Sequence, residues 1–285
     1  MRNLSDIGVI KEILSRHGFT LSKSLGQNFL IDPAICPAMA KASGAQTGTG
    51  VLEIGPGIGI LTAELAKLAD KVVAVELDKR LLPILDETLA EFDNIEIVHA
   101  DILKLDLQKF IAEKFAGMRV VVCANLPYYI TSPVIMLLLE SRLPVEAVTV
   151  MVQKETAERF CARVGTRVAG AVTVAVDYYA RAKQLFEVPH DSFLPAPKVD
   201  SMVIMLEIRS KPPVDVKDEA GFFRMVKAAF GQRRKTAANG ISAGTGIEKG
   251  QIAAAIERAG FDPNVRAESL SMEELAGLYN EIVCG

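Results

Sequence analysis

Residues 51–68 read VLEIGPGIGILTAELAKL, and this stretch decides the fold class. Residues 51–54 form a short apolar run that predicts a buried strand, and residues 60–68 carry a helical pattern. The loop between them holds three glycines, of which Gly55 and Gly57 permit a tight turn and a close approach of the backbone to a ligand. The third glycine comes one residue earlier than in the dinucleotide-binding pattern G-x-G-x-x-G. The stretch therefore predicts a strand–loop–helix unit with a ligand-binding loop.

Further apolar runs alternate with helical patterns such as the one over residues 79–90. They predict strands over residues 71–75, 95–98, 120–124 and 145–152. Strands that alternate with helices imply parallel pairing, so we expect a doubly wound α/β sheet. Residues 182–188 and 201–208 also predict strands but have no helix-length segment between them. We expect these two strands to form an antiparallel pair at one edge, an ending that distinguishes methyltransferase sheets from ordinary dinucleotide-binding sheets.

The end of the chain has a different pattern. Residues 209–214 contain two prolines and no periodicity, which is typical of a linker. Helical patterns alone follow, near residues 218–230, 248–259 and 271–283. We therefore expect a sheet domain over residues 1–208 and a small all-α domain over residues 209–285.

The composition excludes several classes of protein. Half of the 285 residues are hydrophobic and the net charge is −3, so the chain can bury a large core and is not basic throughout. Its longest apolar runs are too short to span a membrane and its first residues lack the apolar core of a signal peptide, so we expect a soluble, cytoplasmic protein. The four cysteines and three histidines are scattered, and we expect no disulfide and no metal site.

Acidic residues follow two of the predicted strands. Glu76 ends the strand after the glycine loop, where an acidic residue can hold a ribose diol. Asp101 follows the next strand, although a solvated loop or a helix N-cap also explains an aspartate there. The loop lacks a Walker-type lysine, which disfavours a triphosphate. A nucleoside without a large phosphate group fits these strand ends best.

Residues 125–130 read NLPYYI and follow the predicted strand 120–124. Ligands of open α/β sheets bind at the carboxyl ends of the strands. An amide at that position can accept a hydrogen bond from an exocyclic amine, and an aromatic ring beside it can stack on a base. The motif therefore predicts chemistry on the amino group of a purine.

Together these motifs resemble those of the ribosomal RNA adenine N6,N6-dimethyltransferases. The resemblance covers most of the chain and rests on residues 23–32 (KSLGQNFLID), 53–62 (EIGPGIGILT), 75–78 (VELD), 99–101 (HAD), 125–128 (NLPY), 193–201 (FLPAPKVDS) and 230–236 (FGQRRKT). It implies a seven-stranded, Rossmann-like methyltransferase sheet that uses S-adenosylmethionine. It also implies cofactor contacts at Asn28, Leu30, Gly55, Glu76, Asp101 and Asn125.

Two stretches depart from the family pattern. Residues 167–173 lack the aromatic and serine that the family often has there, and residues 237–239 read Ala-Ala-Asn where a leucine is common. Either departure could alter RNA contacts or packing.

For the reaction we expect Asn125 Oδ1 and the Leu126 carbonyl to accept the two N6 hydrogens of adenine. Tyr128 would stack on one face of the base, at about 1–3 kcal/mol per base. Phe193 is the candidate for the other face, although a core aromatic beside a strand explains it equally well.

The expected partner is small-subunit rRNA within a pre-ribosomal particle, bound by a monomer. Residues 224–235 contain five basic residues and no acid, and Arg233, Arg234 and Lys235 are the candidate RNA contacts, although a charge run can also be a solvated face. Three alternatives remain: a large-subunit rRNA methyltransferase of the antibiotic-resistance type, a non-catalytic assembly factor and a small-molecule methyltransferase. The first type tends to carry isoleucine where this chain has Leu126.

Overall fold

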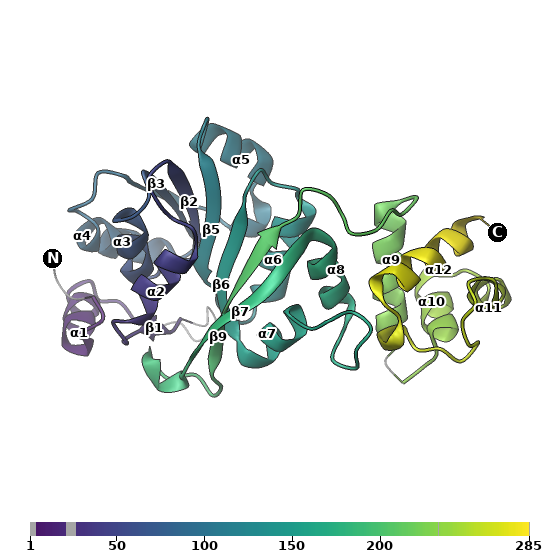
Figure 1. The fold of residues 1–285 in the computed structure, drawn as a ribbon. Helices are drawn as coiled ribbons and strands as arrows, with labels where there is room; N and C mark the ends of the chain where they lie inside the picture. The colour runs from purple at the N-terminus through teal and green to yellow at the C-terminus, as the bar shows by residue number, and fades with distance from the viewer. Residues whose placement is uncertain (1–3, 21–26, 233, 285) are drawn as a thin grey trace. The chain divides into compact units, whose positions relative to one another are not determined.

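The computed structural model describes residues 4–20, 27–232 and 234–284. Its strands are β1 (Phe29–Leu30), β2 (Thr49–Ile54), β3 (Lys71–Glu76), β4 (Ile95–His99), β5 (Arg119–Asn125), β6 (Ala147–Gln153), β7 (Ala180–Val188), β8 (Phe193–Leu194) and β9 (Ser201–Ile208) (Figure 1). Its α-helices are α1 (Ile7–Arg16), α2 (Ile35–Ala42), α3 (Ile60–Ala66), α4 (Leu82–Thr88), α5 (Leu107–Lys114), α6 (Thr131–Glu140), α7 (Lys154–Phe160), α8 (Ala171–Tyr179), α9 (Glu219–Phe230), α10 (Ala237–Thr245), α11 (Lys249–Arg258) and α12 (Met272–Cys284).

Seven strands form the main sheet in the order β4-β3-β2-β5-β6-β9-β7. The five strands from β4 to β6 pair in parallel, and β9 pairs antiparallel with β6. The doubly wound sheet and its edge of β9 and β7 confirm the sequence prediction. Because β2 lies between β3 and β5, the ends of these three parallel strands meet at one edge.

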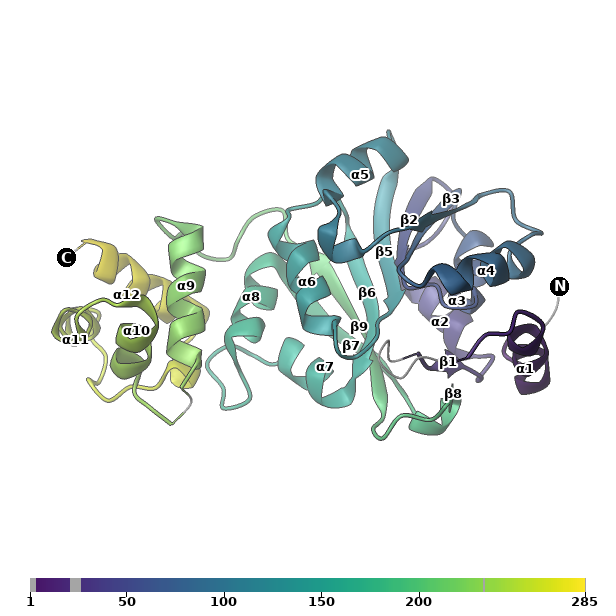
Figure 2. The ribbon, with the colours of Figure 1, turned by 180° about the vertical axis from the view of Figure 1, so that it is seen from behind.

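Helices cover both faces of this sheet. On one face α2 and α3 pack against apolar side chains of the central strands, including the fully buried Val51, Val72 and Cys123. Helix α6 lies behind the sheet in Figure 1 and in front of it in Figure 2, so it covers the opposite face. Burial on two faces explains why the central strands read as continuous apolar runs rather than as an alternating pattern.

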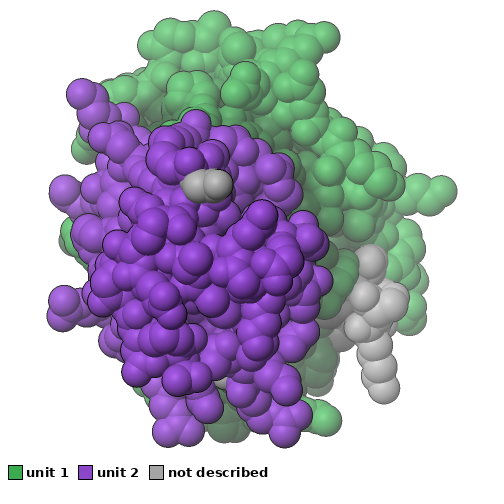
Figure 3. Space-filling view, turned by 90° about the vertical axis from the view of Figure 1, so that its right-hand side faces the viewer, with its two compact units in different colours: residues 1–157, 182–208 green, residues 158–181, 209–285 purple. Residues whose placement is uncertain are grey.

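The chain divides into two compact units, residues 1–157 with 182–208, and residues 158–181 with 209–285 (Figure 3). The last of the three boundaries, between residues 208 and 209, falls at the start of the segment that the sequence suggests as a linker. Residues 158–181, which contain α8, group with the C-terminal helices because α8 packs against α9. Tyr179 Oη donates a hydrogen bond to Glu219 Oε1 at 2.7 Å across that contact.

The helical unit contains α10, which the sequence analysis did not predict. This helix packs closely on α9 because it carries small residues at the contact. A Cβ on Gly244 would lie 2.4 Å from Ala228 Cβ, and a Cβ on Gly240 would lie 2.9 Å from the Ala229 carbonyl oxygen. The two glycines therefore let the helices approach, but they also remove the apolar periodicity that sequence analysis relies on.

No described helix is long and apolar enough to cross a membrane. Over the same residues, no group of three or more His, Cys, Asp or Glu side chains is arranged to hold a metal ion.

Candidate functional site

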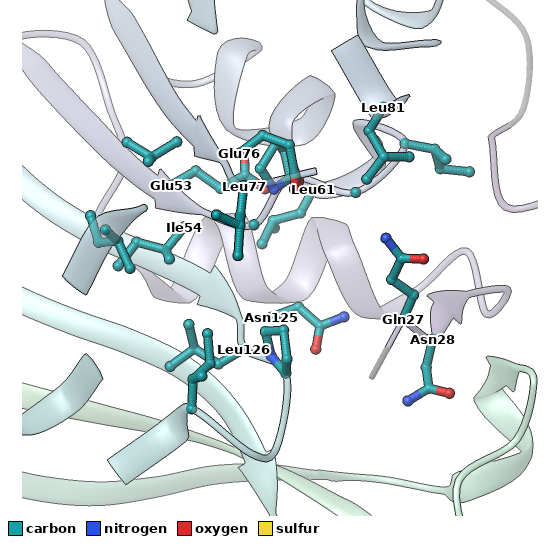
Figure 4. A pocket seen from close by; sticks show the side chains of 18 of the residues that line it. Gln27, Asn28, Glu53, Ile54, Leu61, Glu76, Leu77, Leu81, Asn125 and Leu126 are labelled. Carbon is teal, nitrogen blue, oxygen red and sulfur yellow. The ribbon is translucent and has the colours of Figure 1, made fainter. Parts of the chain in front are cut away.

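A pocket of about 280 Å³ opens at the carboxyl ends of the parallel strands in the sheet unit (Figure 4). In Figure 4 Gln27 and Asn28 lie on one side of this pocket, Glu76 and Leu77 lie on the other, and Asn125 stands between them. The pocket brings together every catalytic and cofactor residue predicted from the sequence: Asn28, Leu30, Gly55, Glu76, Asp101, Asn125, Leu126, Tyr128 and Phe193.

The glycine loop forms one wall of the pocket. Gly55 and Gly57 have φ angles of 72° and 61°, a backbone region that L side chains rarely adopt. A Cβ built on Gly55 would meet no atom within 4 Å, so the backbone there faces open space. The loop thus exposes its backbone to the pocket.

Glu76 is only 6% exposed at the end of β3. Its Oε1 accepts a hydrogen bond of 2.7 Å from the Asp78 backbone N–H. Burial raises the pKa of Glu76, and hydrogen bonds from the backbone of Asp78 and Gly57 oppose that rise. The carboxylate is therefore held in place by the backbone while it lines the pocket.

Asp101 lines the pocket and also caps a short helical turn. Its Oδ1 accepts a hydrogen bond of 3.1 Å from Leu103 N, and its Oδ2 lies 3.2 Å from Lys104 Nζ. The helix-cap interpretation of this aspartate is correct, and it is compatible with a place in the pocket wall.

Glu53 on β2 is a pocket residue that the sequence analysis did not name as a site residue. It is 1% exposed, and burial raises its pKa to about 8, with the Glu76 carboxylate adding to the rise and the Thr62 hydroxyl opposing it. Within the described part of the chain, Oε2 of Glu53 has no hydrogen-bonding partner. A lone acid inside the apolar strand 51–54 was the signal in the sequence that could have identified it.

The turn that follows β5 is tied down at two points. The Pro127 carbonyl accepts hydrogen bonds from Ile130 N at 3.1 Å and from Thr131 Oγ1 at 3.3 Å. Tyr128 Oη lies 2.8 Å from Ser201 Oγ on β9, which fixes the end of the tyrosine ring. Asn125 and Tyr128 are therefore presented to the pocket by a rigid turn.

Phe193 is a core aromatic that also lines the pocket, which is compatible with both interpretations of this residue. It pairs with Leu30 in a two-stranded sheet of β1 and β8, is 3% exposed and belongs to the hydrophobic core, yet it also lines the pocket. This pairing brings Leu30 to the pocket across 163 residues of sequence, a contact that no local pattern reveals.

The predicted RNA contacts lie in the helical unit. Arg234 and Lys235 are exposed, as are Arg224 and Lys227 on α9, and the Arg224 guanidinium lies 3.5 Å from Asp218 Oδ2. Arg233 falls outside the described residues, as do residues 23–26 of the N-terminal motif.

The sequence analysis also did not name several other residues that line the pocket. Leu77, Leu103 and Tyr129 line the pocket although each is 40% exposed or more. Leu77 and Tyr129 lie within the VELD and NLPYYI motifs, and Leu103 comes two residues after Asp101, which is the only sequence signal they carry.

Residues 18–283 match the family described as "Ribosomal RNA adenine dimethylase". The chain belongs to this family. Two relatives named "Ribosomal RNA small subunit methyltransferase A" come from Geobacillus thermodenitrificans, at 50% identity over 99% of this chain and 98% of the relative, and from Clostridioides difficile, at 45% identity over 99% and 98%.

Solved structures of the family's fold agree with this assignment. A dimethyladenosine transferase from Plasmodium falciparum matches with a TM-score of 0.70 and 25% identity, over 88% of this chain and 95% of that structure. The 23S rRNA methyltransferase ErmE matches with a TM-score of 0.67 and 26% identity, over 90% of this chain and 99% of that structure. The seven-stranded sheet is thus that of an S-adenosylmethionine-dependent methyltransferase.

The pocket fits the methyl donor of the rRNA adenine dimethylases, S-adenosylmethionine. This cofactor joins an uncharged adenosine to a methionine part that carries an ammonium, a sulfonium and a carboxylate, so its net charge is positive. The pocket offers the carboxylates of Glu76 and Asp101, the unpartnered Oε2 of Glu53 and the open backbone at Gly55. These groups suit a cationic nucleoside.

Proposed function

We propose that this protein transfers methyl groups from S-adenosylmethionine to N6 of adenine in small-subunit rRNA and dimethylates that amine. The observation that carries the proposal is the convergence of Asn125 and Tyr128 with Glu76 and Asp101 on one pocket in a chain of the rRNA adenine dimethylase family. Identities of 45–50% to relatives named for the small subunit favour that substrate.

For the cofactor, we assign Glu76 to the ribose hydroxyls and Asp101 to the adenine end. Asn28, Leu30 and Gly55 would complete this part of the site. Glu76 is suited to its role because backbone N–H groups fix its carboxylate, which leaves remaining lone pairs to accept from a diol. When bound, the cofactor supplies an electrophilic methyl group.

For the target base, we assign Asn125 Oδ1 and the Leu126 carbonyl as acceptors for the two N6 hydrogens. The amine is a poor nucleophile because its lone pair is delocalised into the ring. Two acceptors favour a more tetrahedral nitrogen, and the rigid turn aims that nitrogen at the methyl carbon. Orientation of this kind can contribute up to about 7–11 kcal/mol.

Tyr128 and Phe193 would hold the two faces of the target base. The Tyr128 ring is pinned by its hydrogen bond to Ser201, so little ordering is required when the base enters. Phe193 is almost fully buried, and only the part that lines the pocket is available to a base.

In the helical unit, we assign Arg234 and Lys235, with Arg233, to phosphate contacts. Their target is structured RNA, which proteins recognise largely by shape. We further infer that the protein acts in the cytoplasm as a monomer on a pre-ribosomal particle.

The test is transfer of labelled methyl to small-subunit particles and, in parallel, to large-subunit RNA, with the product mapped by mass. We expect dimethyladenine in small-subunit RNA only. Labelling confined to large-subunit RNA would instead favour the activity named for the ErmE structure, and no labelling of either would favour an assembly factor.

A further inference from the structure

The N-terminal segment that lines the pocket bonds to the buried carboxylate of Asp78, in addition to the pairing of β1 with β8. Asp78 follows β3, and its side chain is 6% exposed. Asp78 Oδ2 accepts a hydrogen bond of 3.0 Å from Gln27 Nε2. Gln27 lines the pocket, whereas Asp78 itself does not.

Arg80 holds that carboxylate in a two-pronged ion pair. Its Nε donates to Asp78 Oδ1 at 2.8 Å and its Nη2 donates to Asp78 Oδ2 at 2.6 Å. The Arg80 backbone N–H also donates to Oδ1, at 3.1 Å. A bidentate arrangement of this kind fixes orientation as well as distance.

Arg80 also contacts the chain on the other side of the N-terminal motif. Its guanidinium carbon lies 4.9 Å from the centre of the Phe19 ring, and its Nη1 lies 3.4 Å from the Thr20 carbonyl oxygen. The Asp78–Arg80 pair therefore contacts described residues both before and after residues 21–26.

The same loop is bonded to the pocket acid of β3. The Asp78 backbone N–H donates to Glu76 Oε1 at 2.7 Å. One short loop thus links Glu76, which we assign to the ribose, with Gln27 and the neighbouring Asn28 and Leu30.

We propose that Asp78 and Arg80 form a clamp that positions residues 27–30 for cofactor binding. Asp78 is a positioning residue in this scheme, because it acts through Gln27 and Glu76 and lines no part of the pocket. The inference rests on the proposed function of the pocket as a cofactor site.

The test compares Asp78→Asn with a matched control, Glu146→Gln. Glu146 forms an equally short bidentate pair with Arg119, at 2.6 and 2.7 Å, at the start of β5 and away from the pocket. We expect Asp78→Asn to weaken S-adenosylmethionine binding, measured by calorimetry, about tenfold, because a charge-assisted network of this size is lost. Turnover at saturating cofactor should stay within about twofold, and Glu146→Gln should change neither quantity.

A second readout uses the cofactor-free protein. Next to the pairing of Leu30 with Phe193, the Ile31 N–H donates to the Ser192 carbonyl at 2.9 Å, so the Ile31 amide is protected when the segment is in place. We expect hydrogen exchange at Ile31 to speed up about tenfold in Asp78→Asn and to stay unchanged in the control. If Asp78→Asn does not fold, Arg80→Gln takes its place in the test, because the Arg80 side chain is half-exposed. We expect this variant also to weaken cofactor binding and to speed up hydrogen exchange.

Unchanged exchange and unchanged cofactor affinity in a folded Asp78→Asn or Arg80→Gln variant would overturn the clamp. Failure of the wild-type protein to bind S-adenosylmethionine would instead refute the proposed function, while the exchange measurement would still test whether the clamp orders the segment.

Discussion

Replacing Glu53 with glutamine removes one buried ionisable group from β2 and changes little else. Glutamine has nearly the shape of a protonated glutamic acid and does not ionise near neutral pH. Burial raises the pKa of Glu53 from 4.5 to about 8 in the folded protein, whereas the unfolded chain keeps the ordinary value. The free energy of unfolding must therefore depend on pH through this residue.

The direction follows from the order of the two pKa values. Below pH 4.5 the carboxyl is protonated in both states, and its full contribution to stability is present. Between pH 4.5 and about 8 the unfolded chain loses the proton while the folded protein keeps it. Stability then falls by up to about 1.4 kcal/mol per pH unit, and the loss ends above the folded pKa.

The expected result is a difference in the free energy of unfolding between wild type and Glu53→Gln that grows with pH. From pH 5 to pH 8 the wild-type protein should lose about 3 kcal/mol relative to Glu53→Gln. The measurement is urea unfolding of the cofactor-free proteins, followed by circular dichroism at pH 5, 6.5 and 8 and constant ionic strength. Titrating groups that do not interact with Glu53 are present in both proteins and cancel in the difference, whereas the Glu76 carboxylate is one cause of the raised pKa of Glu53.

The control is again Glu146→Gln, because Arg119 lowers the pKa of that exposed carboxylate. The difference in the free energy of unfolding between Glu146→Gln and wild type should not grow as the pH rises from 5 to 8. A Glu53→Gln difference that stays constant within about 0.5 kcal/mol from pH 5 to 8 would refute the reasoning, because Glu53 would then ionise at its ordinary pKa in the folded protein.

Three further outcomes test the site and the fold. Asn125→Ala should lower turnover on small-subunit particles about 10²–10³-fold, the usual cost of removing one positioned hydrogen-bonding group, and near-normal turnover would exclude the proposed role of the amide. Arg234→Glu with Lys235→Glu should weaken RNA binding and reduce the slope of log affinity against log salt by about 2, and an unchanged slope would exclude phosphate contacts there. Gly221→Ala should lower the melting temperature by several degrees at a cost of about 1–3 kcal/mol, because the new Cβ would lie 2.0 Å from Tyr279 Oη, and an unchanged temperature would mean that the ring moves freely aside.

Local patterns were enough to predict most of the sheet unit. The apolar runs and the glycine loop predicted β2, β3, β5 and β6 because each of these strands is buried on both faces. The helical unit was harder to predict. Helix α10 contains Gly240 and Gly244, which allow it to pack closely on α9 but add nothing to an apolar stripe.

Helix α8 shows a second limit of prediction from local sequence patterns. Its sequence, AVTVAVDYY, is rich in β-branched residues that favour strands. The structure makes it a helix because Tyr178 and Tyr179 pack against Phe222 and Phe223 of α9. Tertiary packing here outweighs local propensity, so residues 158–181 join the helical unit although they lie inside the predicted sheet domain.

The fold class, the glycine loop, the acids at the strand ends and the NLPY turn could all be predicted from the sequence, because each depends on neighbours in the chain. How these parts meet depends on long-range contacts in the folded protein. Leu30 reaches the pocket through Phe193, Tyr128 is fixed by Ser201, and Gln27 is held by Asp78, in pairs separated by 51 to 163 residues. Such contacts form when the sheet assembles, and neither periodicity nor motif spacing encodes them.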